Sequence, residues 1–224
     1  MSGYAIWQYV HILLFVYWLG ADLGVFFAAR YVARADLPTP ERLRFLELLL
    51  TVDMGPRTAL ILMVPVGFVL ATQLGLTPFA APWLPLIWIV AVAWLALTWR
   101  LFWLGRDPRA QSWTRIDYWL RVVVAALFVS LGLTSLATSR PVPVDWLAVK
   151  MLLFGIVVVL GLLLRTTIRD WAVGFERLRD PGQVETGNAL IRSAYRRATR
   201  LAHTLWLLIA IIALLGVTKP SWLT

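Results

Sequence analysis

The chain has 224 residues, of which 60% are hydrophobic, and its mean hydropathy is +0.76. This composition excludes an ordinary soluble protein, because several apolar runs approach the ~20 residues that cross the ~30 Å hydrocarbon core of a bilayer. The net charge is +9, and the lack of cysteine excludes disulfides, iron–sulfur clusters and thiolate metal sites.

The hydropathy pattern predicts an all-α bundle of six membrane-spanning helices in a single domain, residues 1–224. The expected spans are about 5–30, 52–75, 84–104, 118–138, 146–167 and 199–217. Arginines gather after the first, third and fifth spans, whereas the loops at 76–83 and 139–145 carry only Arg140 and Asp145. Because positive residues stay cytoplasmic, we expect both termini on the outer side of a bacterial inner membrane. The same distribution favours anionic membrane lipids, and not nucleic acid, as partners.

The first span carries two ionisable residues, His11 and Asp22. They are eleven residues apart, close to three helical turns, so they share a face with Phe15 and Trp18. One interpretation makes His11 a metal ligand on haem iron or a proton carrier, with the aromatic rings lining a flat cofactor. The other makes it an interfacial histidine hydrogen-bonded near the outer surface, within an ordinary aromatic belt.

Two features near the first connection predict how the helices meet their surroundings. On the side of the first span opposite His11, Gly20 and Gly24 have a small-xxx-small spacing that would let another helix approach closely. Residues 39–51 are amphipathic enough to run along the membrane interface before the second span begins near Val52.

The second span opens with an acid and a base, Asp53 and Arg57, at i and i+4. This spacing lets them neutralise each other near the cytoplasmic interface. Pro56 lies between them and Pro65 follows, which predicts a kinked helix with freed carbonyls. The arrangement fits a substrate or proton port, and it equally fits a helix start closed by a salt bridge.

Two further ionisable residues lie in the last two predicted spans. His203 is expected near the inner end of the last span and His11 near the outer end of the first, so their depths differ by roughly 10–20 Å at 1.5 Å per residue. One haem held by both is therefore disfavoured against two sites or a five-coordinate haem. Lys150 follows Trp146 at the outer end of the fifth span, where it either marks the membrane boundary or has an anionic partner.

Four segments carry a family resemblance: H-x6-W-x-G in the first span, MGPRTALIL in the second, WLAVKMLL around Lys150, and GVTKP at the end of the last span. Together they resemble the bacterial haem-b protoporphyrinogen oxidases of the HemJ type and the wider CopD-like set of small membrane proteins. The chain differs from that pattern by two additional spans, 84–104 and 118–138, between the matching pairs.

The resemblance implies that His11 binds haem b and that Lys150 contacts a haem propionate or a substrate carboxylate. Arg30 lies about one turn beyond the position of the arginine that ends the family's first helix, and it is a further candidate for contact with the cofactor. The remaining candidates are Trp18 and His203 for the cofactor and Asp22, Asp53 and Arg57 for proton handling.

Three functions remain open on these grounds. The first is a haem-b redox protein, which passes electrons from a small, possibly porphyrinogen-like substrate to a quinone or a partner subunit. The second is a CopD-like transporter or channel for a metal ion or protons. The third is a non-catalytic anchor or assembly subunit of a homo- or hetero-oligomer. The sequence contains no nucleophile–base constellation, phosphate loop or dinucleotide fingerprint.

Overall fold

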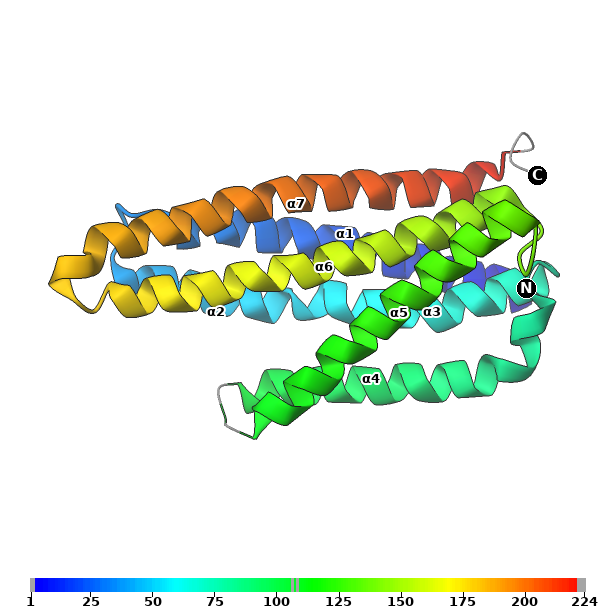
Figure 1. Ribbon diagram of the computed structural model, residues 1–224, viewed down its shortest axis with the longest axis horizontal. Helices are drawn as coiled ribbons and strands as arrows, with labels where there is room; N and C mark the ends of the chain where they lie inside the picture. Colours follow the sequence, from blue (N-terminus) through cyan, green and yellow to red (C-terminus); the bar gives the residue numbers. More distant parts are fainter. Residues whose placement is uncertain (1–2, 106, 108, 221–224) are drawn as a thin grey trace.

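The computed structural model describes residues 3–105, 107 and 109–220, and over those residues it contains helices and no strand. Figure 1 shows long helices running side by side along the longest axis of the molecule, with α5 crossing obliquely. In chain order the elements are α1 (Gly3–Val32), α2 (Thr39–Val52), α3 (Met54–Gln73), η1 (Pro78–Trp83), α4 (Leu84–Leu104), α5 (Ala110–Thr138), α6 (Asp145–Arg177), η2 (Pro181–Gln183) and α7 (Val184–Thr218).

Six helical segments in the described part of the chain are long and apolar enough to cross a membrane, which confirms the expected all-helical, six-span pattern. The start of α1 and the end of α7 lie at one end of the bundle in Figure 1, and the α6–α7 connection lies at the other. We call these the terminal end and the arginine-rich end. The helices extend beyond the expected spans, since α5 begins eight residues before 118 and α6 ends ten residues after 167.

Residues 39–51 lie in α2, which continues into α3. Asp53, which joins α2 to α3, has helical dihedral angles (φ −61°, ψ −17°), and Figure 1 shows the two helices in line. The buried residues Leu46 and Leu49 of α2 belong to a small core at the arginine-rich end that also contains Trp171 and Ile191. The apolar face of α2 therefore packs on neighbouring helices.

Arg42 lies in this small core with only 2% of its surface exposed. Its Nε donates to the Val32 carbonyl at 2.9 Å, and its Nη1 donates to the Asn188 side-chain oxygen at 2.7 Å. The guanidinium also lies 5.1 Å from the centre of the Phe175 ring. One arginine thus joins the end of α1 to α6 and α7.

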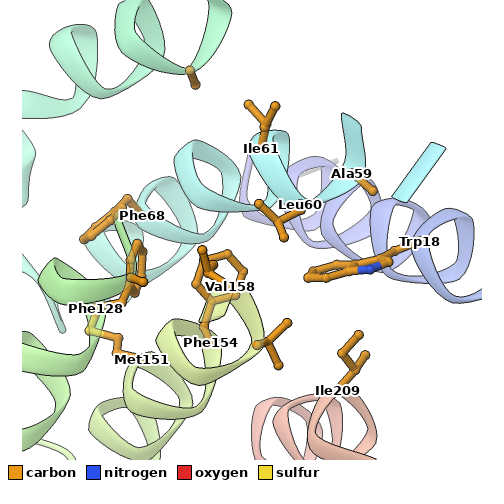
Figure 2. Packing of buried hydrophobic residues seen from close by; sticks show 14 of the residues in the cluster. Trp18, Ala59, Leu60, Ile61, Phe68, Phe128, Met151, Phe154, Val158 and Ile209 are labelled. Atoms are coloured by element: carbon orange, nitrogen blue, oxygen red, sulfur yellow. The ribbon is translucent and has the colours of Figure 1, made fainter. Parts of the chain in front are cut away.

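The larger core lies toward the middle of the bundle and is rich in aromatic side chains (Figure 2). Phe128 of α5 packs on Phe154 of α6 with ring centres 4.8 Å apart and on Phe68 of α3 at 5.9 Å. Trp18 of α1 meets the same Phe154 edge-on at 6.4 Å. These contacts connect α1, α3, α5 and α6.

Glycines set the closest helix crossings. A Cβ at Gly132 of α5 would lie 2.7 Å from the backbone nitrogen of Leu152, and one at Gly155 of α6 would lie 2.9 Å from the carbonyl oxygen of Ala125. Because these neighbours are backbone atoms, α5 and α6 can pack at this distance only when both positions lack a side chain.

Candidate functional site

His11 lies on α1 facing α3, at a level where α3 has no side chain. A Cβ at Gly67 would lie 3.7 Å from the imidazole Cε1. The Nδ1 atom of His11 is buried and has no hydrogen-bond partner among the described residues. Since a buried polar atom without a partner costs free energy, this nitrogen is suited to an added proton acceptor or to a metal.

Lys150 extends from α6 toward α7, where its Nζ lies beside Gly216. The ammonium is close enough to interact electrostatically with both the His11 imidazole and the Lys219 ammonium. No salt bridge joins Lys150 or Lys219 to a carboxylate within residues 3–105, 107 and 109–220. We call His11, Lys150 and Lys219 the terminal basic cluster.

Trp18 lies two turns beyond His11 on α1, but its position is that of a core residue. Only 5% of its surface is exposed, and its indole packs on Phe154. An imidazole with an unpartnered nitrogen near the Lys150 ammonium could hold the iron and a propionate of haem b.

His203 and Asp22 lie on facing surfaces of α7 and α1. Trp206 donates its indole N–H to Asp22 Oδ2 at 2.6 Å, and His203 packs on Phe26 and Trp206 with ring centres 5.5 Å away in each case. Phe26 is fifteen residues after His11, which is about 22 Å along a helix. His203 and His11 are thus too far apart to bind one iron.

The other sequence candidates lie away from His11. Arg30 is exposed near the end of α1, nineteen residues from His11 and about 28 Å along the helix. Asp53 and Arg57 form the expected ion pair, with Arg57 Nε donating to Asp53 Oδ2 at 2.7 Å. The structure therefore brings His11 and Lys150 together and separates them from the candidates for proton handling.

The most buried charged group near α4 and α5 is one that sequence reasoning missed. Asp117, with 1% of its surface exposed, accepts hydrogen bonds from the Trp94 indole at 2.9 Å and from Arg121 Nε at 3.2 Å. Arg165 of α6 donates to the same carboxylate. We call these four residues the Asp117 cluster. The missed signal was the i,i+4 spacing of Asp117 and Arg121 across the expected start of the fourth span.

No group of three or more His, Cys, Asp and Glu side chains suited to a metal ion is present in the described part of the chain. Comparisons with protein-family models, with curated proteins and with solved structures found no match to this chain. The fold and the six apolar helices define a multi-pass helical membrane protein.

Proposed function

We propose that this chain is a haem-b-binding integral membrane protein with a redox role. The observation that carries the proposal is the terminal basic cluster, in which the His11 Nδ1 atom lacks a partner and Lys150 lacks a carboxylate among the described residues. Haem b, when bound, supplies one-electron chemistry. We place it in a bacterial inner membrane, with both termini outside because arginines gather after the first, third and fifth spans.

In this proposal each residue of the terminal basic cluster has its own role. His11 holds the metal through its imidazole. The ammonium of Lys150 pairs with a propionate, because charge-assisted hydrogen bonds to carboxylates are short and strong. Lys219, exposed at the end of α7, adds positive charge that attracts anionic substrates to this face. The packed Trp18–Phe154 pair excludes water from the arginine-rich side of the site.

Protons are handled in this proposal by carboxylates toward the arginine-rich end. Asp53 and Asp117 are paired with arginines, so protonating either would leave a guanidinium unpaired in the membrane. Asp22 instead accepts from the neutral Trp206 indole and has no salt bridge within the described residues. Asp22 is therefore the carboxyl group best suited to carry a proton. A quinone or a partner subunit in the bilayer would receive the electrons.

The experiment that tests this proposal is the absorption spectrum of protein purified after expression with ample haem supply. We expect a Soret band that is lost in His11→Ala and retained in the matched variant His203→Ala. A colourless wild-type preparation would overturn the haem proposal. Loss of the band in His203→Ala alone would show that the wrong ligand was chosen.

A second candidate, proton transport of the CopD-like kind, is favoured by one specific observation. Asp22 is within Coulombic range of Asp53, and Arg57 is within range of Asp117, so ionisable groups follow one another across α1, α3 and α5. Ionisable residues at membrane depth often mark proton relays. Proton flux into liposomes that falls in Asp22→Asn, from a protein without a Soret band, would favour transport over the haem proposal.

A further inference from the structure

The Asp117 cluster contains more hydrogen-bond donors than its carboxylate can accept. The Trp94 indole donates to Asp117 Oδ1, whereas Arg121 Nε and Arg165 Nη2 both donate to Oδ2. The Nη2 atom of Arg121 is left buried without a partner, although only 6% of this residue is exposed. None of the described residues accepts a hydrogen bond from this N–H group, and a buried donor without an acceptor costs free energy.

The charge balance points in the same direction. Arg57 is within Coulombic range of both Asp117 and Arg121, and its ion pair with Asp53 adds one charge of each sign. Within the Asp117 cluster itself, the two guanidiniums of Arg121 and Arg165 and the one carboxylate of Asp117 leave a net charge of 2 − 1 = +1. Because an uncompensated charge at membrane depth is costly, one bound anion would stabilise this region.

A second unpartnered polar group lies on α4, one turn after Trp94. Thr98 is four residues after Trp94, on the same buried face, and its hydroxyl is buried without a hydrogen-bond partner among the described residues. The Arg121 guanidinium also makes a cation–π contact with the Trp94 ring, with its Cζ 5.3 Å from the ring centre. Helices α4 and α5 thus each supply one buried donor, the Thr98 hydroxyl and Arg121 Nη2, that has no acceptor among the described residues.

We propose that the Asp117 cluster binds one phosphate oxyanion with Arg121 Nη2 and the Thr98 hydroxyl as donors. The planar guanidinium fork suits phosphate oxygens, and a phosphodiester carries the single negative charge that the cluster lacks. Arg165, whose side chain is 26% exposed, connects the cluster to the molecular surface. The group comes either from an anionic phospholipid of the adjoining leaflet or from free phosphate. The site does not depend on haem.

Thermal unfolding of the purified full chain in a neutral detergent tests the site and its source. Three ligands are titrated: inorganic phosphate, short-chain phosphatidylglycerol, and phosphatidylcholine of the same chain length. We expect a saturable rise in Tm with at least one of the two anions and none with phosphatidylcholine. A response to phosphatidylglycerol alone assigns a lipid, and a response to inorganic phosphate assigns a free anion. No response to either anion overturns the proposal.

Three variants locate the binding. Arg121→Gln is expected to weaken anion binding about tenfold or more, because a charged donor is lost. Thr98→Val removes an unpartnered hydroxyl, so it should weaken binding several-fold and leave the unliganded Tm unchanged. Asp117→Asn raises the charge excess, so it should tighten binding even as the unliganded protein loses stability.

The control for these variants is Arg196→Gln, an exposed arginine on α7 that should bind the anion like the wild type. If Arg121→Gln does not fold, Thr98→Val and Asp117→Asn decide the question. Wild-type affinity in both of them, or an equal loss in Arg196→Gln, would show that the cluster is a purely structural ion pair.

Discussion

The ammonium of Lys150 on α6 packs directly beside Gly216 on α7. A Cβ at position 216 would lie 2.5 Å from Lys150 Nζ, closer than real atoms approach, and 3.6 Å from its Cε, which is ordinary van der Waals contact. The neighbour is the far end of a flexible side chain, so the helix backbones would not have to move. A side chain at position 216 would therefore move the Lys150 ammonium but leave its positive charge in place.

Gly216→Ala is expected to displace the Lys150 ammonium. If the protein binds haem as proposed, this should weaken haem retention by about 1 kcal/mol, or about fivefold, because the proposed charge-assisted hydrogen bond to a propionate is misplaced. The ratio of Soret to protein absorbance after dilution measures this. Gly161→Ala is the matched control, since a Cβ at that position meets nothing within 4 Å. An unchanged ratio in Gly216→Ala would remove Lys150 from the site.

Gly132→Ala is expected to lower the free energy of unfolding by about 1–3 kcal/mol, because the added methyl group would overlap the backbone of α6 and overpack the crossing. A Cβ there would lie 2.8 Å from the Ala148 carbonyl oxygen as well as against Leu152. Thermal unfolding in detergent gives the comparison. Gly20→Ala, which meets nothing within 4 Å, should behave as the wild type. Equal stability of the two variants would mean that α5 and α6 are packed less closely.

Arg42→Ala is expected to cost about 2 kcal/mol, because the Val32 carbonyl and the Asn188 side chain lose their buried donor. Limited proteolysis should report loosening at the arginine-rich end before the rest of the bundle unfolds. Arg44→Ala on the exposed side of the same helix serves as the control. Cleavage at equal rates in both variants would argue against a joining role for Arg42.

Trp206→Phe keeps an aromatic ring beside Phe26 but removes the indole N–H that donates to Asp22 Oδ2. We expect a loss of about 1–3 kcal/mol in thermal unfolding, the usual cost of leaving a buried acceptor without its partner. In an Asp22→Ala background the same substitution should cost much less. Additive costs would mean that the indole and the carboxylate do not interact. Trp103→Phe, at a residue 76% exposed, controls for loss of an indole.

The six apolar helices were predictable because the length of an apolar run alone fixes whether a helix can span hydrocarbon. Hydropathy did not predict how far the helices extend beyond the expected spans. Asp117 and Arg121 satisfy each other at i,i+4, so α5 continues through them from Ala110. Residues 39–51 looked suited to an interface because amphipathicity does not tell whether lipid or another helix covers the apolar face.

The candidate site was predictable only in part. Topology placed His11 and Lys150 at the same end of the bundle, and the structure brings them within Coulombic range. Their neighbours Gly67 and Gly216 could not be predicted, because a glycine carries no sign of which helix it faces. The spacing of Gly20 and Gly24 predicted a close approach, which the structure shows at Gly24, where a Cβ would lie 3.2 Å from Val52 Cγ1, but not at Gly20, which meets nothing within 4 Å.

The most direct test of the central claim is chemical rescue of the His11→Gly variant with imidazole. If His11 is the haem ligand, the variant should lose the wild-type Soret band, and free imidazole added with haem should restore it. His203→Gly should keep the band without imidazole. A His11→Gly protein that retains the wild-type spectrum, or a wild-type protein that binds no haem, would contradict the account.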